Sequence, residues 1–279
     1  MKIQDLIDIG AKELREIARR PKLEAEMLLA DALGQERIWL HMHYHDDVDT
    51  QSFFRYIELR KNHVPIEYIL GHVSFYSEDF LITDGVLIPR PETELLIDIT
   101  SQAISENGFT KIVEIGTGSG IIAVMLAKLH PEIFVTATDI NEKAIQLAQK
   151  NAERFGVSDR IRFVRTSYLE GVEDPFDLLV SNPPYIANNF PLEPNLDYEP
   201  DTALFGGEKG DEMIKQIIDL SIAKGIRVLT IEMGYDQKAP LQAYFDSKGV
   251  SSVVFYQDLA GLDRGFRADL SASESEEGN

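Results

Sequence analysis

The chain of 279 residues contains no cysteine, so disulfide bonds and thiolate metal sites are excluded. The absence also indicates a reducing compartment. No run of 18 apolar residues and no signal-peptide pattern is present, and we therefore expect a soluble, cytoplasmic protein that makes no membrane contact. Apolar residues still make up 44% of the chain, enough to form the core of one large domain or of two ordinary ones.

Positive charge is also scarce. The formal net charge is −20, of which residues 1–72 carry −3 and residues 73–279 carry −17. Nucleic-acid affinity depends largely on Lys and Arg neutralising phosphates, so such an acidic surface fits a phosphate backbone poorly. It would suit a basic protein partner, but for net charge alone the better interpretation is that the acidity only keeps the protein soluble.

The residue pattern divides the chain into four segments. Residues 1–72 show apolar side chains at helical spacing and no chemical motif, which predicts a small helical bundle. Residues 73–88 contain two short β-prone runs and are predicted to form a β-hairpin linker. Residues 89–270 are predicted to form a catalytic domain, and the polar, acidic residues 271–279 a disordered tail.

From Lys111 onward, strand and helix patterns alternate. Such alternation predicts an α/β domain with a mostly parallel, doubly wound, Rossmann-like sheet and right-handed crossovers. The expected strands are residues 112–115, 134–138, 161–165, 176–180, 227–232 and 250–257. The expected helices are residues 121–129, 142–155, 211–223 and 237–247.

A glycine-rich loop, Glu114-Ile-Gly-Thr-Gly-Ser-Gly120, lies between a predicted strand and a predicted helix. Glycines there let a ligand approach the backbone closely at the helix N-terminus. The spacing G-x-G-x-G differs from the G-x-G-x-x-G of dinucleotide-binding proteins. Asp139 ends the next strand, where an acidic residue usually binds ribose hydroxyls. The pair indicates a nucleoside-containing cofactor; a tight turn with a surface aspartate is the alternative.

The segment Asn182-Pro-Pro-Tyr185 follows a short apolar strand. Two prolines cannot donate to a sheet ladder and both have φ locked, so a stiff loop is expected at the carboxyl end of that strand. Ligands bind at this edge of open α/β sheets. The asparagine, the carbonyls beside the prolines and the flat tyrosine ring suit a planar group bearing an NH2. An amide and an exocyclic base amine both fit this description.

Together these motifs resemble those of S-adenosylmethionine-dependent class I methyltransferases that modify planar nitrogen. Six segments follow the order seen in the HemK/PrmC family, the protein-(glutamine-N5) methyltransferases of peptide chain release factors. They are Ile88-Pro-Arg-Pro-Glu-Thr-Glu94, Glu114-Ile-Gly-Thr-Gly-Ser-Gly120, Asn182-Pro-Pro-Tyr185, Glu199-Pro-Asp-Thr-Ala-Leu-Phe-Gly-Gly207, Glu232-Met-Gly-Tyr-Asp-Gln237 and Asp258-Leu-Ala-Gly-Leu-Asp-Arg264. The helical N-terminal region and the hairpin also fit that family's layout.

The resemblance implies S-adenosylmethionine as the cofactor and a role for each motif. The loop residues Gly116, Thr117, Gly118, Ser119 and Gly120 would hold the methionine end. Asp139 would hold the ribose, and Tyr168 stands where the family often has a tryptophan near the adenine. Asn182 would also contact the cofactor, and the substrate amide would bind Asn182, Pro183, Pro184 and Tyr185. No role is assigned to Arg90, Glu92 or Glu94.

The expected mechanism needs orientation rather than a strong base, because an amide nitrogen is a weak nucleophile. The Oδ1 atom of Asn182 and the Pro183 carbonyl can accept the two N–H bonds, and Tyr185 can pack against the amide plane. Positive charge develops on the nitrogen, so these acceptors bind the transition state more tightly than the ground state. Asn182, Pro183 and Tyr185 are the expected catalytic residues, and no metal is required.

Two other classes of function share some of these motifs. An adenine-N6 or cytosine-N4 nucleic-acid methyltransferase shares the Asn-Pro-Pro-aromatic loop, but must extrude a base and hold a phosphate backbone. The charge of residues 73–279 argues against it, and against an rRNA or tRNA methyltransferase. A nucleoside-sensing module would leave Asn182-Pro-Pro-Tyr185 unexplained. We therefore expect a monomeric enzyme whose partner is a release factor presenting its Gly-Gly-Gln loop, with the helical bundle as a substrate-docking domain and no direct nucleic-acid binding.

Overall fold

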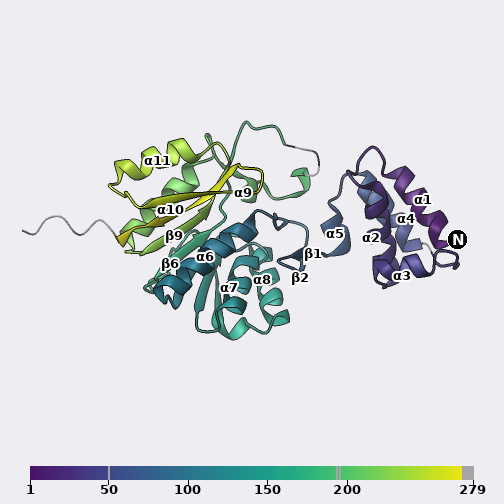
Figure 1. The fold of residues 1–279 in the computed structure, drawn as a ribbon, viewed down its shortest axis with the longest axis horizontal. Helices are drawn as coiled ribbons and strands as arrows, with labels where there is room; N and C mark the ends of the chain where they lie inside the picture. The colour runs from purple at the N-terminus through teal and green to yellow at the C-terminus, as the bar shows by residue number, and fades with distance from the viewer. Residues whose placement is uncertain (50, 193, 195, 272–279) are drawn as a thin grey trace, which may run out of the picture. The chain divides into compact units, whose positions relative to one another are not determined.

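The computed structural model of the protein describes residues 1–49, 51–192, 194 and 196–271 (Figure 1). The chain forms two compact units. The first contains residues 1–73, 82–84 and 192–198, and the second contains residues 74–81, 85–191 and 199 onward. The predicted tail, residues 271–279, lies outside the described residues except for Ser271. Among the described residues, no helix is both long and apolar enough to cross a membrane.

The first unit is helical. Its α-helices are α1 (Ile3–Glu13), α2 (Pro21–Leu33), α3 (Arg37–Met42), α4 (Gln51–Lys61) and α5 (Ile66–Leu70), and it also contains the 3₁₀ helix η2 (Leu196–Tyr198). Pro21 occupies the first turn of α2 and Gly34 ends that helix with φ 62°. Leu6, Leu28 and Phe53 are fully buried in a core that α1, α2 and α4 share.

A two-stranded hairpin, β1 (His72–Phe75) with β2 (Glu78–Leu81), follows the helical unit in sequence. Within the second unit, β2 is fastened to helix α8 (Glu142–Arg154). The buried Asn151 side chain accepts from the Leu81 amide at 2.9 Å and donates to the Leu81 carbonyl at 3.1 Å. Phe80 packs on Phe155 with ring centroids 4.5 Å apart. These contacts tie the second strand of the hairpin to the α/β unit.

The second unit is built on a seven-stranded sheet in the order β10-β11-β9-β6-β3-β4-β5. Its strands are β3 (Lys111–Ile115), β4 (Phe134–Asp139), β5 (Ile161–Arg165), β6 (Leu178–Ser181), β9 (Val228–Glu232), β10 (Val253–Gln257) and β11 (Asp263–Asp269). Strands β5, β4, β3, β6 and β9 are parallel, and β11 runs antiparallel to both of its neighbours, β9 and β10. The predicted mostly parallel sheet is confirmed.

Helices cover both faces of this sheet (Figure 1). α6 (Thr93–Asn107), α7 (Ile121–Leu129) and α8 lie on one face, and α10 (Glu212–Ala223) and α11 (Lys238–Ser247) lie on the other. The remaining elements are η1 (Ser158–Arg160), β7 (Ile186–Ala187), α9 (Asp201–Leu204) and β8 (Phe205–Gly207). α7 is almost wholly buried, which explains why its sequence is apolar on all sides.

Two features of the sheet differ from the sequence expectation. The strand expected at residues 250–257 begins only at Val253, and β11 is not among the expected strands. Strand β11 combines buried residues with charged ones such as Arg267, which is bonded to Glu106 at 2.6 Å. With so few apolar residues, its period-two signal is too weak to recognise.

Candidate active site

The glycine loop between β3 and α7 has a backbone that only glycine adopts easily. Gly116, Gly118 and Gly120 have φ of 75°, 55° and 82°. A Cβ on Gly120 would also lie 2.8 Å from the Ala148 Cβ, so α7 and α8 could not approach as they do. Asn151 supports the loop from below by donating to the Ser119 carbonyl at 2.8 Å. The predicted strand–loop–helix arrangement is therefore present, with its tightest packing at the third glycine.

Two carboxylates flank this loop. Glu114 is fully buried and accepts from the Thr117 hydroxyl at 2.7 Å, and burial raises the pKa of its carboxyl group to about 8. Its Oε1 atom has no hydrogen-bond partner among the described residues. Asp139 ends β4 and accepts from the Gly118 amide at 2.9 Å and the Asn141 amide at 2.8 Å. Burial also raises the pKa of Asp139.

A pocket opens beside the glycine loop, at the carboxyl edge of the sheet. Six predicted site residues line it directly: Gly116, Gly118, Asp139, Tyr168, Asn182 and Pro184. Apolar side chains form much of the remaining wall: Val86, Leu87, Ile115, Ile140, Ala144, Pro200, Ala203 and Met213. A carboxylate at a strand end, a glycine loop and apolar walls are the features that fit a nucleoside with a flexible tail.

Other predicted site residues lie behind or beside this pocket rather than on its wall. Thr117 and Ser119 are 3% exposed, and Pro183 is buried. Tyr168, which does lie on the pocket wall, has φ 47°, and its hydroxyl donates to Gln216. The hydroxyl of Tyr185 is directed instead to the Glu232 carboxylate.

The backbone of the Asn182-Pro-Pro-Tyr185 loop is held in place by close packing against another segment of backbone. β7 pairs with β8, so the loop lies against the Phe205–Gly207 segment. A Cβ on Gly206 would lie 2.3 Å from the Pro184 carbonyl oxygen. The Gln237 side chain donates to the Tyr185 carbonyl at 2.9 Å. The loop therefore has little freedom to move, as its two prolines also require.

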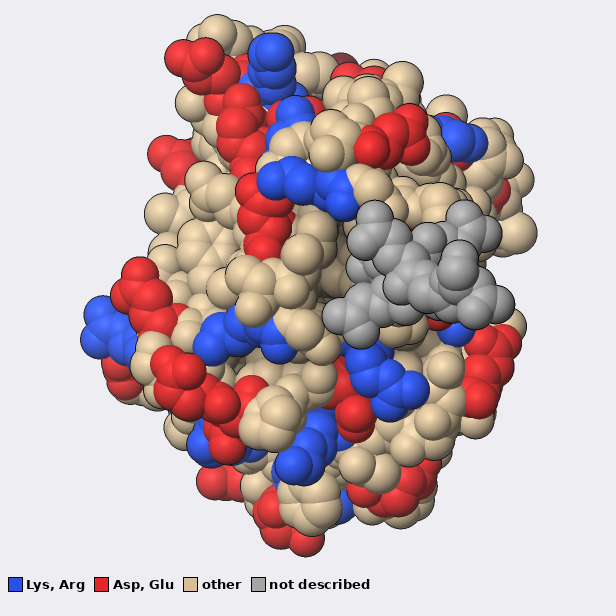
Figure 2. Space-filling model, turned by 90° about the vertical axis from the view of Figure 1, so that its left-hand side faces the viewer, with Lys and Arg blue, Asp and Glu red and all other residues tan. Residues whose placement is uncertain are grey.

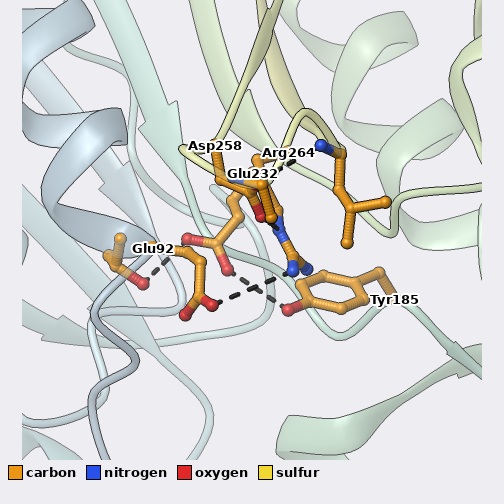
Figure 3. Close-up of polar contacts among 8 residues, drawn as sticks. Glu92, Tyr185, Glu232, Asp258 and Arg264 are labelled. Carbon is orange, nitrogen blue, oxygen red and sulfur yellow. Dashed lines mark hydrogen bonds and ion pairs between the residues drawn. The ribbon is translucent and has the colours of Figure 1, made fainter.

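The side chains of this loop are bonded to residues far away in the chain. The Asn182 Nδ2 atom donates to Thr93 Oγ1 at 3.1 Å, and Thr93 Oγ1 donates to Glu232 Oε2 at 2.8 Å. The Tyr185 hydroxyl donates to Glu232 Oε1 at 3.2 Å, and Figure 3 shows it pointing at that carboxylate. Glu232 is 1% exposed. One buried carboxylate thus contacts both polar side chains of the loop, directly or through a hydroxyl.

The proline-rich segment before α6 forms a second link. Arg90 and the Ile88 amide both bond to the Glu199 carboxylate, at 2.5 Å and 2.9 Å. The Glu199 side chain is 1% exposed. This contact fastens the start of the Glu199–Gly207 segment to the chain that supplies Val86 and Leu87 to the pocket wall. Arg90 therefore has a structural partner that the sequence pattern did not reveal.

Sequence reasoning missed Thr93, Glu232, Glu199, Gln237 and Gly206 as individual contributors. All five stand inside segments that carried the family resemblance, which was the available signal. The four polar residues among them bond to partners that lie about 50 to 140 positions away in the sequence. Thr93 and Glu232 are 139 positions apart, and Ile88 and Glu199 are 111 positions apart. No local pattern identifies such pairs.

Comparisons with known proteins agree with this geometry. The family described as Methyltransferase small domain matches residues 91–191, and that described as PrmC N-terminal domain matches residues 5–71. The release factor glutamine methyltransferase of Clostridium acetobutylicum is 32% identical over 276 residues, covering 95% of this chain and 97% of that protein. That of Dictyoglomus turgidum is 36% identical, covering 87% of this chain and 89% of that protein.

Solved structures show the same fold at lower identity. The hMettl16 catalytic domain, solved in complex with MAT2A 3′UTR hairpin 6, is 22% identical with a TM-score of 0.58. The match covers 68% of this chain and 75% of that chain. The ribosomal protein L11 methylase of Lactobacillus delbrueckii subsp. bulgaricus is 20% identical with a TM-score of 0.50, covering 67% and 83%.

The sheet order, the glycine loop at the end of β3 and the pocket beside it define a class I methyltransferase. Relatives above 30% identity extend over almost the whole length of the chain. This protein belongs to the family of release factor glutamine methyltransferases.

Proposed function

We propose that this protein transfers a methyl group from S-adenosylmethionine to the side-chain amide nitrogen (N5) of the glutamine in the Gly-Gly-Gln loop of class 1 peptide chain release factors. The observation that carries the proposal is the Asn182-Pro-Pro-Tyr185 loop, held rigidly at the edge of the pocket beside the glycine loop, with the Nδ2 atom of Asn182 already bonded to Thr93. Family membership supports the choice of a glutamine. A translation factor as substrate implies a cytoplasmic enzyme.

The pocket residues fit S-adenosylmethionine, whose sulfonium supplies an electrophilic methyl group when bound. Asp139 offers a carboxylate for the ribose hydroxyls. The Gly116–Gly120 loop leaves room for the methionine end, and Tyr168 offers a flat face for the adenine. Asn182 lies on the wall of the same pocket, so the substrate amide would be held next to the methyl donor.

The chain's own residues would then orient a poor nucleophile. Asn182 Oδ1 and the Pro183 carbonyl accept the two N–H bonds of the substrate amide, and the Tyr185 ring packs on the amide plane. As the nitrogen acquires positive charge, both acceptors bind it more strongly. Their positions need no rearrangement during the reaction, because the prolines and the β7–β8 pairing hold the loop.

A nucleic-acid substrate is less compatible with the charge of the second unit. Each of its arginines is bonded to a carboxylate or to backbone carbonyls: Arg90, Arg154, Arg160, Arg162, Arg165, Arg227, Arg264 and Arg267. On the face drawn in Figure 2, basic side chains stand in small groups among acidic and uncharged ones. Binding a phosphate backbone there would require breaking many of these pairs.

The deciding experiment supplies labelled S-adenosylmethionine together with release factor or with DNA. We expect label in the Gly-Gly-Gln glutamine of intact release factor and none in a release factor whose glutamine is replaced by alanine. A short Gly-Gly-Gln peptide should be methylated with a higher KM, because surfaces elsewhere, including the N-terminal unit, would contribute to docking. Label in DNA with none in release factor would overturn the proposal.

The cofactor assignment predicts that Asp139→Ala raises the Kd for S-adenosylmethionine by roughly tenfold or more, since hydrogen bonds to a charged group contribute about 1.5–3 kcal/mol. Asp139→Asn keeps one acceptor oxygen and should fall between the alanine variant and wild type. Isothermal titration calorimetry measures both. Asp159→Ala, at an exposed position of the same unit, serves as the matched control. An unchanged Kd in Asp139→Ala would remove Asp139 from the site.

A further inference from the structure

Glu232 is a buried carboxylate that has no direct role in the proposed methyl transfer. It ends β9, is 1% exposed, and receives hydrogen bonds from the hydroxyls of Thr93 and Tyr185 at 2.8 Å and 3.2 Å. Burying a carboxylate is costly unless its lone pairs are used. Both donors that satisfy it belong to, or are bonded to, the loop that would hold the substrate amide.

The hydroxyl of Thr93 takes part in two hydrogen bonds, one with Glu232 and one with Asn182, and the direction of each can be worked out. A hydroxyl has a single hydrogen, and an ionised carboxylate can only accept, so Thr93 must donate its hydrogen to Glu232. The Thr93 oxygen is then left as an acceptor, and only the NH2 end of the Asn182 amide can satisfy it. Asn182 Oδ1 is thereby turned to the opposite side, where an incoming NH2 group needs an acceptor.

Tyr185 is oriented by the same carboxylate. Its hydroxyl donates to the second oxygen of Glu232, while its backbone carbonyl is held by Gln237. The ring is therefore anchored at both ends. A flat contact surface that cannot rotate keeps a bound amide in one plane.

We propose that Glu232 is a positioning residue that sets the hydrogen-bond polarity of the amide site, turning Asn182 through Thr93 and anchoring Tyr185 directly. The inference rests on the proposed function and extends it to specificity. A site that presents acceptors selects a primary carboxamide, which donates two N–H bonds. A glutamate side chain in the same place has no N–H to donate and, when ionised, brings a carboxylate against those acceptors.

The charges around Glu232 make this polarity depend on pH. The pKa of Glu232 is raised to about 7, and burial is the largest cause. Nearby Glu92 also raises this pKa, whereas the hydrogen bonds from Thr93 and Tyr185 and the charge of Arg264 act to lower it. Arg264 itself bonds Asp258 at 2.7 Å and lies 3.8 Å from Glu92, and the neutral Tyr256 hydroxyl is also close. A dashed line in Figure 3 marks the ion pair between Glu92 and Arg264.

Protonated Glu232 gains a donor, which lets the Thr93 hydroxyl reverse and donate to Asn182. The carboxylate form orients the site, so kcat should rise with pH to a plateau above about 7. Below that value kcat should fall about tenfold for each pH unit, as expected for a single titrating group.

The test compares Thr93→Val, Thr93→Ser and Glu232→Gln with wild type on release factor. Thr93→Val keeps the shape but cannot accept from Asn182, and should lower kcat at least tenfold. Thr93→Ser keeps the hydroxyl and should stay within about threefold of wild type. The Kd for S-adenosylmethionine should change less than twofold in both. Glu232→Gln should lose the dependence of kcat on pH near 7 and show a lower plateau.

Two results would overturn the proposal: a wild-type kcat in Thr93→Val, or an unchanged pH limb in Glu232→Gln. If Glu232→Gln does not fold, as judged by thermal unfolding, the Thr93→Val and Thr93→Ser pair decides alone. Wild-type activity on release factor tests the proposed function separately. Should the wild type methylate another amide or amine instead, the same variants are compared on that acceptor.

Discussion

Asn182→Ala is expected to lower kcat for methyl transfer by about a hundred- to a thousand-fold, the loss typical of removing one preorganised group that stabilises developing charge. The substitution deletes the Oδ1 acceptor and also leaves Thr93 without its donor from the loop. The backbone of the loop should stay in place, because the prolines and the β7–β8 pairing do not depend on this side chain. Single-turnover kinetics with saturating S-adenosylmethionine measures the effect on chemistry.

The Kd for S-adenosylmethionine shows whether Asn182→Ala affects the chemical step alone or damages the whole pocket. Asn182 lines the pocket, yet most of its wall comes from other residues, so the Kd for S-adenosylmethionine should change only about threefold or less. Asn189→Ala is the matched control: it removes the same side chain from an exposed position just after β7. Near-normal turnover in Asn182→Ala would show that Asn182 does not hold the substrate amide.

The second large effect is expected from Gly206→Ala. A Cβ there would lie 2.3 Å from the Pro184 carbonyl oxygen and 2.5 Å from the Gly210 carbonyl oxygen, far inside van der Waals contact. Both are backbone atoms, so the clash is relieved only by backbone movement, which would displace the Asn182-Pro-Pro-Tyr185 loop or the β8 segment packed against it. We expect kcat to fall at least tenfold, together with roughly 1–3 kcal/mol of destabilisation from overpacking.

The variant Gly225→Ala is the control that shows whether kcat falls in Gly206→Ala because the loop moves or because the protein is less stable. Gly225 has φ 67° with open space around it, so alanine there should cost about 1–2 kcal/mol through backbone strain alone. Its kcat should remain at the wild-type value although its stability falls by a similar amount. Chemical denaturation and steady-state kinetics on both variants give the comparison. Equal kcat in the two variants would contradict the role given to Gly206.

Much of the fold is predictable because its signals are local. The alternation of apolar runs identifies β3, β4, β5, β6 and β9 and the helices between them. Strand β11 escapes recognition since charged residues such as Arg267 occupy more than half of its positions. The short strands β7 and β8 escape it as well, because segments of two or three residues carry no periodicity.

The sequence by itself determined the two loops that meet at the pocket. The glycine loop needs positive φ, which Gly116, Gly118 and Gly120 adopt easily. The second loop needs a stiff backbone, which Pro183 and Pro184 provide because their φ is locked. Both properties depend on residue type alone. For that reason the order of residues is enough to recognise both loops.

Only the tertiary structure decided which way the Asn182 amide faces. Its orientation depends on Thr93, 89 positions away, and on Glu232, 139 positions from Thr93. These three side chains meet because β6 and β9 are neighbours in the sheet and α6 packs against β9. Strand order and helix packing arise from the whole core, so no short segment of sequence encodes the meeting of these residues.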